Sequence, residues 1–143
     1  TELNCKKLVL KLGISKYVKF IKFMPNKEVA GFISNSDLFV STSLSDGSSL
    51  SLMEGISCGL PVIVTKVPAF KEWVFEGKNG YLINFGDSEA LTNKINALLS
   101  DKEKLANMSL ESLKIAEDKA DWDKNFEVLK STYETLSRRI NNE

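Results

Sequence analysis

Two carboxylates stand eight positions apart in this sequence, and a short stretch of Gly and Ser separates them. After Asp46 the chain runs through Gly47, Ser48, Ser49 and Leu50, and apolar residues then recur at helical spacing towards Glu54. A helix that starts here would offer free backbone N–H groups to phosphate oxygens. One acid would precede the helix and the other would lie about a turn inside it, so the pair could bind hydroxyls at opposite ends of a phosphate-linked ligand. This arrangement suits a nucleotide sugar.

The same residues also have simpler structural interpretations. Ser51 and Glu54 have the spacing of a capping box, in which the Glu54 carboxylate accepts a hydrogen bond from the Ser51 backbone N–H. The Asp46–Gly47 dipeptide is common in turns, and a run of small polar residues is typical of a solvated loop. Local sequence alone leaves both the ligand-binding and the structural interpretations open.

Short apolar runs alternate with helical patterns along the chain. Four runs predict strands, at residues 17–23, 38–40, 62–64 and 81–83. Besides the helix after Ser49, helical spacing predicts helices over residues 5–12, 29–33, 91–99, 105–116 and about 121–140. Strands that alternate with helices indicate an α/β fold with a doubly wound parallel sheet.

The loop that carries Asp46 follows a predicted strand that ends near Thr42. In open parallel sheets, ligands bind beyond the carboxyl ends of the strands. The position of this loop and the chemistry of its residues therefore favour the same site.

Length and charge narrow the range of functions. The chain has 143 residues, 43% of them hydrophobic, which predicts one domain. Its formal net charge is zero, so we expect no large field that recruits nucleic acid or an acidic membrane surface. No apolar run approaches the ~20 residues that span a bilayer, and we expect no signal peptide.

The two cysteines, Cys5 and Cys58, are too few and too far apart to suggest a disulfide framework, and neither has a metal-ligand spacing. This cysteine usage favours a reducing compartment, and we expect the protein to be cytoplasmic.

The segment from Ser43 to Ile83 carries an ordered set of motifs. The two acids are followed by Cys58-Gly59-Leu60-Pro61, by Val62-Ile63-Val64, by Glu72-Trp73 and by Gly77-Lys78-Asn79-Gly80-Tyr81-Leu82. In this order the segment resembles the retaining glycosyltransferases of the GT-B fold, family four, also described as glycosyl transferases group 1. Their signature is two glutamates separated by seven residues, followed by a helix that ends in C-G-x-P-V. The resemblance extends upstream through residues 18–23 and 37–40 and downstream to Asp121-Trp122.

The resemblance implies that this chain is the Rossmann-like, carboxyl-terminal half of a GT-B fold, which binds a nucleoside diphosphate sugar. In that family pattern Glu54 would bind the ribose hydroxyls, and Asp46 would bind a hydroxyl of the transferred sugar. The backbone amides of Gly47, Ser48, Ser49 and Leu50 would bind the diphosphate. Asp46 is one methylene shorter than the usual glutamate, so its contact would come from a closer loop or through a water. The family relation implies transfer with retention, with no metal ion and no other cofactor.

The resemblance also implies that residues 1–143 form a single nucleotide-sugar-binding domain from a longer enzyme. An amino-terminal acceptor domain and the first strand-to-helix segments would be absent, so the isolated domain would bind donor but hardly turn it over. The acceptor would be a glycan or a lipid-linked molecule of cell-surface polysaccharide or glycoconjugate synthesis. The missing half could place the enzyme at the inner face of the membrane.

The closing helix would cross back towards the missing half. By this analogy, Tyr133, Leu136 and Ile140 should be exposed in the isolated chain, while Trp122 and Phe126 should pack on their own domain.

Two other functions fit the same residues. One is a catalytically silent nucleotide-sugar-binding module, which the Asp at the first acidic position makes credible. The other is a different GT-B enzyme, such as a nucleotide-sugar epimerase, which shares the two-domain cleft.

Overall fold

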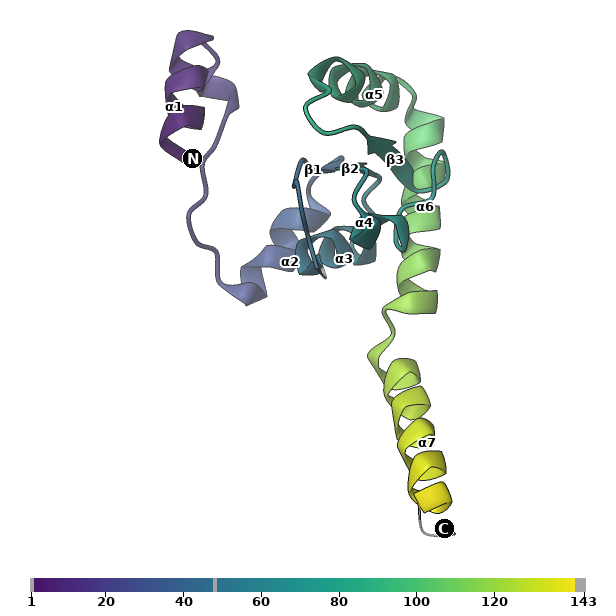
Figure 1. The fold of residues 1–143 in the computed structure, drawn as a ribbon. Coiled ribbons are helices and arrows are strands. Elements are labelled where there is room, and N and C mark those ends of the chain that lie inside the picture. The colour runs from purple at the N-terminus through teal and green to yellow at the C-terminus, as the bar shows by residue number, and fades with distance from the viewer. Residues whose placement is uncertain (1, 48, 141–143) are drawn as a thin grey trace.

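The computed structural model of the chain describes residues 2–47 and 49–140. Its elements, in order, are α1 (Glu2–Lys11), the 3₁₀ turn η1 (Ser15–Tyr17), α2 (Asn26–Ser34), β1 (Phe39–Ser41), α3 (Leu50–Ser57), β2 (Val62–Thr65), α4 (Pro68–Lys71), β3 (Gly80–Ile83), α5 (Ser88–Ser100), α6 (Lys102–Lys119) and α7 (Trp122–Ile140). Figure 1 shows a central body around the sheet, with α1 and α7 standing away from it on opposite sides.

The sheet consists of parallel strands in the order β1-β2-β3. Phe39 lies opposite Val62 in the first pair, and Val62 lies opposite Gly80 in the second. All four residues of β2 are buried, as expected for the central strand of a parallel sheet that is covered on both faces.

Helices cover both faces of the sheet, which confirms the predicted doubly wound fold. On one face Val62 and Val64 pack with Leu52 and Ile56 of α3. On the other face lies a second cluster, made of Ile63, Tyr81, Ile83, Leu98 and Met108, which come from β2, β3, α5 and α6. The alternation of side chains along β2 therefore feeds two separate cores.

Helix α6 runs beside the sheet and is fixed to the turn that precedes β2. The Ser109 hydroxyl donates to the carbonyl of Gly59, and the buried Ser112 hydroxyl donates to the carbonyl of Leu60 at 2.7 Å. Gly59 itself has a φ of +75°, the left-handed conformation that ends many helices, and here it follows α3. These bonds satisfy the carbonyl groups of a buried connection.

The predicted strand over residues 17–23 is wrong. Tyr17 ends the short turn η1, and the chain then runs to Pro25 without regular secondary structure and without a strand partner among the described residues. Its β-branched and aromatic residues are compatible with a strand, but a strand is stable only when a neighbour takes up its backbone hydrogen bonds. Figure 1 shows this segment as the connection between the separate α1 and α2.

Helix α7 has almost the predicted bounds and begins at a capped residue. The Asp121 carboxylate accepts the Lys124 backbone N–H at 3.1 Å and pairs with the Lys124 ammonium group at 3.2 Å. Both contacts lower the pKa of Asp121. None of the residues of α7 is buried. The expected exposure of Tyr133, Leu136 and Ile140 is therefore confirmed for this chain.

The expected packing of Trp122 and Phe126 on the body is wrong. Trp122 is 76% exposed and Phe126 is 48% exposed. The two rings stack on each other with their centroids 6.3 Å apart. The reason is visible in Figure 1, where the chain leaves α6 through a short turn and α7 points away from the sheet.

Gly80 gives a sharp test of the pairing between β2 and β3. A Cβ atom at Gly80 would lie 2.0 Å from the carbonyl oxygen of Val62, which is backbone and cannot give way without loss of register. We expect Gly80→Ala to lower the free energy of unfolding by about 3 kcal/mol or more. A Cβ at Gly31, in the middle of α2, meets nothing within 4 Å.

The control Gly31→Ala should leave stability unchanged or raise it by about 0.5–1 kcal/mol, because Ala is the better helix former. Urea denaturation of the two variants checks this. Equal stability of Gly80→Ala and the parent would contradict the β2–β3 register.

Candidate functional site

The loop after β1 leads directly into the amino terminus of α3, as the sequence predicts. Asp46 is partly buried in this loop, and Gly47 is exposed. Ser48, which is also a predicted phosphate-binding residue, lies outside the described residues. Because β1 is parallel to β2 and β3, this loop lies at the edge of the sheet where ligands of such folds bind.

Ser49 is the N-cap residue of α3 and directly precedes its first helical residue, Leu50. Its hydroxyl oxygen accepts the Leu52 N–H at 3.3 Å and lies 3.4 Å from the Ser51 hydroxyl, and Ser49 is 8% exposed. The side chain of Ser49 is thus engaged as a cap, and what it can offer a ligand is its backbone. Leu50 and Ser51 are the first two residues of α3, so their N–H groups have no acceptor within the helix and are of the kind that binds anions at helix amino termini.

The capping-box interpretation of Ser51 and Glu54 is wrong. The cap is Ser49, so the position a capping-box glutamate would occupy is filled by Leu52. Glu54 lies one turn further into α3 and is exposed, and its carboxylate makes no hydrogen bond or ion pair with the other described residues. Its carboxylate is therefore available to a ligand.

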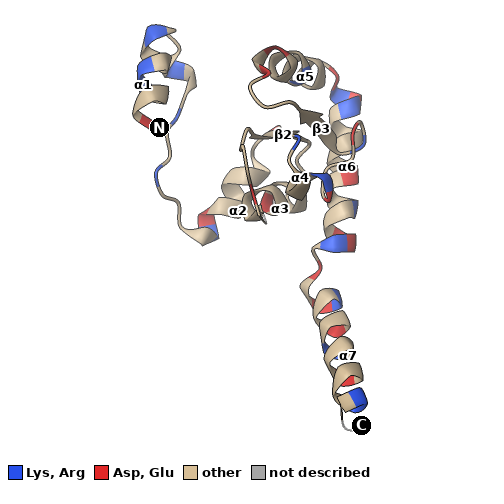
Figure 2. Ribbon diagram, viewed as in Figure 1, with Lys and Arg blue, Asp and Glu red and all other residues tan. Residues whose placement is uncertain are grey.

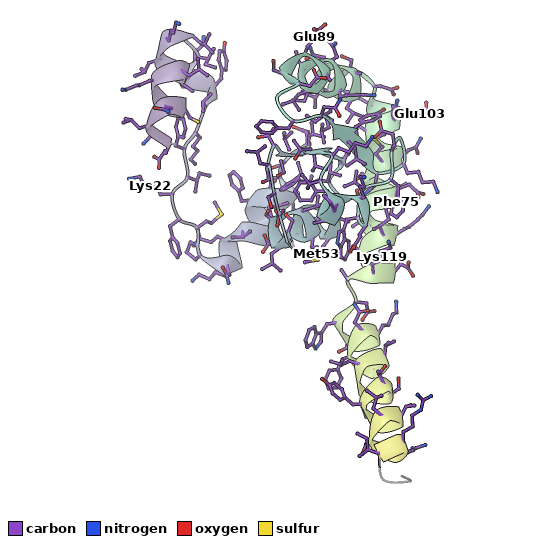
Figure 3. All side chains as sticks on the ribbon, viewed as in Figure 1. Lys22, Met53, Phe75, Glu89, Glu103 and Lys119 are labelled. Carbon is purple, nitrogen blue, oxygen red and sulfur yellow. The ribbon has the colours of Figure 1, made fainter. Side chains whose placement is uncertain are left out.

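A groove of about 380 Å³ runs between α2 and α3, and Glu54 lines it. The residues around it are Asn26, Val29, Ala30, Ile33, Leu50, Met53, Glu54, Ser57, Cys58 and Ala120. Leu50 and Glu54, both predicted site residues, thus reach the same groove. The wall opposite α3 comes from α2, which contributes the apolar residues Val29, Ala30 and Ile33. Figure 3 labels Met53 on α3, below the sheet in this view.

Asp46 does not line the α2/α3 groove. The start of its loop is fixed by a hydrogen bond from the Thr65 hydroxyl, at the end of β2, to the carbonyl of Ser43. The hydroxyls of Ser41 and Ser43 lie 3.2 Å apart and extend this network along the loop. The structure therefore holds the base of the Asp46 loop against the sheet, on the side of the strand ends.

A smaller cavity of about 220 Å³ lies beyond the same strand ends. Its lining includes Thr42 and Thr65, which follow β1 and end β2, and the residues between β3 and α5. A larger hollow of about 470 Å³ lies between the turn before β3 and α6, where Lys78 and Lys104 face Asp101 and Glu111. That hollow contains none of the predicted site residues.

Several motif residues have structural roles. The side chain of the fully buried Asn79 accepts the Phe75 N–H at 2.8 Å and donates to the Trp73 carbonyl at 3.0 Å. Gly80 is required by the close approach of β2. The Gly77–Leu82 motif is thus explained by a turn and by strand pairing.

Sequence reasoning missed the contribution of α2 and Thr65. Val29, Ile33 and Asn26 read as an ordinary amphipathic helix, and a groove wall has the same apolar pattern as a core face. Thr65 reaches a residue 22 positions earlier in the chain. No local spacing reports such a contact.

Among the described residues no group of three or more His, Cys, Asp or Glu side chains is placed to hold a metal ion. The described helices also include none that is long and apolar enough to cross a membrane.

Comparison with known proteins decides the family. The profile of the family described as "Glycosyl transferases group 1" matches residues 1–114. The chain belongs to this glycosyltransferase family.

Relatives of this glycosyltransferase domain include the N-acetyl-alpha-D-glucosaminyl L-malate synthase of Bacillus anthracis. It is 35% identical over 101 residues, which is 71% of this chain and 26% of the relative. The chain covers 23% of a D-inositol 3-phosphate glycosyltransferase of Corynebacterium urealyticum and 32% of spore coat protein SA of Bacillus subtilis. It therefore spans about a quarter to a third of the length of the curated relatives it matches.

Solved structures agree with the fold of the glycosyltransferase domain. The crystal structure of Anabaena Alr3699/HepE in complex with UDP is 28% identical, with a TM-score of 0.82 over 94% of this chain and 36% of that one. Sucrose-phosphate synthase from Thermosynechococcus elongatus, at 21% identity, has a TM-score of 0.87 over 94% of this chain and 34% of that one. The predicted assignment to the carboxyl-terminal half of a GT-B fold is confirmed.

The position of the α3 cap can be tested directly. Ser49→Ala removes the acceptor of the Leu52 N–H in a buried place, so it should lower the free energy of unfolding by about 1 kcal/mol. Ser51→Ala, two positions along on an exposed side of the same turn, should change stability by less than about 0.5 kcal/mol. Urea denaturation followed by circular dichroism distinguishes the two variants. A larger loss of stability in Ser51→Ala than in Ser49→Ala would contradict the assignment of Ser49 as the cap.

Proposed function

We propose that this chain is the donor-binding half of a glycosyltransferase and that it binds a nucleoside diphosphate sugar at the start of α3. The observation that carries the proposal is the exposed Glu54 carboxylate in a groove beside an open helix amino terminus. Together with an amino-terminal domain, the chain would transfer the sugar, with retention, to a glycan or a lipid-linked acceptor.

The groove between α2 and α3 suits a nucleoside. A volume of about 380 Å³ accommodates a base and a ribose, and the apolar side chains of Val29, Ile33 and Met53 provide surface for a flat ring. The ribose presents two adjacent hydroxyl donors, which a carboxylate accepts well. Glu54 is the carboxylate in this groove, so it would orient the ribose.

The start of α3 suits a diphosphate. The N–H groups of Leu50 and Ser51 and the positive end of the helix dipole favour negative charge at this point. With Glu54 one turn further along, the nucleoside would lie along the helix and the phosphates at its tip. Gly47 precedes this helix start by two residues and has no side chain, so its backbone amide would also be accessible to the diphosphate.

Asp46 would meet the sugar. Its loop lies at the carboxyl edge of the sheet, outside the nucleoside groove, and Thr65 holds the base of that loop. A ligand with its nucleoside in the groove and its diphosphate at Leu50 would extend its sugar towards this loop. The carboxylate of Asp46 would accept a hydrogen bond from a sugar hydroxyl.

The chemistry this geometry favours is stabilisation of the leaving group. When the bond between the sugar and the diphosphate breaks, negative charge builds on the diphosphate, and the amides at the start of α3 are aimed at that charge. The amides are fixed by the helix before the reaction begins, so they need little reorganisation. We propose that the transfer needs no metal ion.

The comparisons support the donor class. HepE, which shares this fold at 28% identity, has been crystallised with UDP and with UDP-glucose. The B. anthracis relative is by name an N-acetyl-alpha-D-glucosaminyl L-malate synthase. UDP-glucose is a nucleoside diphosphate sugar, and we propose the same class of donor for this chain.

The role of Glu54 is testable by calorimetry with UDP and GDP. Glu54→Ala should weaken the binding of the nucleoside diphosphate by about tenfold, the loss expected for one charge-assisted hydrogen bond of roughly 1.5 kcal/mol. The control is Glu89→Ala, an exposed acid on α5 that Figure 3 places at the far end of the body. It removes the same charge and should leave the affinity unchanged. Equal affinities for Glu54→Ala and the parent would remove Glu54 from the site.

Asp46 should matter more for chemistry than for nucleotide binding. In the full-length enzyme, Asp46→Asn should lower kcat while the affinity for nucleoside diphosphate changes little, because the contact is to the sugar. Asn keeps the turn preference of this position. The exposed Asp37, just before β1, gives the control Asp37→Asn, which should have full turnover. Unaltered turnover in Asp46→Asn would favour the catalytically silent module.

A further inference from the structure

The loop that carries Asp46 leaves the sheet at the end of β1. The ladder between β1 and β2 ends at Ser41. Among the described residues, the hydrogen bonds of residues 42–47 involve side chains. The Thr65 hydroxyl donates to the Ser43 carbonyl, and the Ser43 hydroxyl lies 3.2 Å from that of Ser41. The bond from Thr65 therefore joins the base of this loop to the neighbouring strand.

Thr65 is itself held firmly in the sheet. It is the last residue of β2, is 1% exposed and lies opposite Ile83 of β3. The N–H of the next residue, Lys66, donates to the Ile83 carbonyl at 2.8 Å, and the Thr65 carbonyl accepts the N–H of Val67 at 2.8 Å. Because a β-branched side chain also has few rotamers, the Thr65 hydroxyl is a fixed point for the loop.

Other interactions give this loop less support. Thr42 and Thr65 line the cavity of about 220 Å³ beyond the strand ends, so the loop base borders a cavity on that side and not a packed core. Asp46 forms no ion pair with another described residue. In Figure 2 the charged residues lie mainly on the helices and connections around the sheet. The direction of the Asp46 side chain therefore depends on the path of its backbone.

We propose that Thr65 is a positioning residue for sugar transfer, because its hydroxyl fixes the loop that directs the Asp46 carboxylate. Ser43 precedes Asp46 by three residues, which span at most about 11 Å, so a shift at Ser43 is passed on to Asp46. A displacement of about 1 Å at a reacting group costs up to about a hundredfold in rate. This role of Thr65 rests on the proposed function, in which Asp46 binds the sugar.

The nucleotide contacts do not depend on the bond from Thr65. Glu54 and Leu50 belong to α3. This helix is packed on β2 by Leu52 and Ile56, which are fully buried. Loss of the Thr65 hydroxyl should therefore lower turnover and leave the affinity for a nucleoside diphosphate nearly unchanged. A residue that only stabilised the fold would not separate these two quantities.

The test compares variants of Thr65 in the full-length enzyme. Thr65→Val keeps the shape and β-branching of the side chain but removes the donor. UDP-glucose, UDP-N-acetylglucosamine and GDP-mannose serve as donors with water as the acceptor, and release of the nucleoside diphosphate gives kcat. On the donor that the parent uses, kcat should fall about tenfold or more. The Kd for UDP or GDP, measured by calorimetry, should change less than about twofold.

Two more substitutions at the same position complete the series. Thr65→Ala removes the hydroxyl without adding a methyl group, so it should give the same fall in kcat even if Val does not fit. Thr65→Ser keeps the hydroxyl and should retain at least about half of the parent's kcat. A fall in Thr65→Ser as large as that in Thr65→Val would overturn the proposal, because the hydroxyl would then not be the group that matters.

Ser112→Ala is the matched control. Ser112 is buried like Thr65 and also donates a hydroxyl hydrogen bond to a backbone carbonyl, that of Leu60. Leu60 precedes β2, so this bond lies at the opposite end of the strand from the Asp46 loop. Ser112→Ala and Thr65→Val should lose similar stability in urea, but Ser112→Ala should keep its kcat. Equal falls in kcat in the two variants would overturn the proposal.

A double-mutant cycle with Asp46→Asn tests whether Thr65 acts through Asp46. In the Asp46→Asn background, Thr65→Val should lower kcat less than about twofold, since the charge that the loop directs is already removed. An unchanged kcat in Thr65→Val, or the same fall in both backgrounds, would overturn the role of Thr65 and leave that of Asp46 intact. An unchanged kcat in Asp46→Asn would overturn both roles, and so would release of nucleoside diphosphate from none of the three donors.

Discussion

The structure depends on the burial of β2 between two hydrogen-bonded neighbours. The N–H of Val62 donates to Asn79 and that of Phe39 to Pro61, each at 3.0 Å, so both edges of β2 are paired near its start. Every residue of β2 is buried. A strand with no exposed face requires helices on both sides of the sheet, and parallel pairing requires each connection to cross back over a face. These two requirements bring the carboxyl ends of all three strands to one edge.

Helix α3 then links the core to the site. Its inner side carries Leu52 and Ile56, which are fully buried against β2. Gly55 allows the helix to approach β1 so closely that a Cβ atom there would lie 3.0 Å from the Phe39 ring. The outer side carries Glu54 into the groove beside α2. Because one short helix serves both purposes, the packing that stabilises the domain also fixes the direction of the proposed ligand contacts.

The two ends of the chain are organised differently from the body. Helix α7 has no buried residue, and most of the large apolar side chains in residues 2–25 are exposed. Local hydrogen bonds and i,i+4 or i,i+3 ion pairs, such as that of Lys124 with Asp121, define these helices. Such local bonds form helices but do not bury apolar surface. The free energy of folding is therefore concentrated in the body.

The sequence alone determined the elements whose signals are local. The apolar runs at 62–64 and 81–83 are buried strands, Gly59 ends α3, and Asp121 begins the last helix, because each of these features depends on a few neighbouring residues. The ordered motifs also indicated the family and the carboxyl-terminal half of the fold.

Tertiary structure decided whatever required a partner from elsewhere in the chain. Residues 17–23 do not form a strand, because no neighbour among the described residues takes up their hydrogen bonds. Trp122 is exposed because α7 points away from the body. Tertiary structure also chose Ser49 over Ser51 as the cap and thereby left Glu54 free in a groove whose far wall, α2, no local pattern could place beside it.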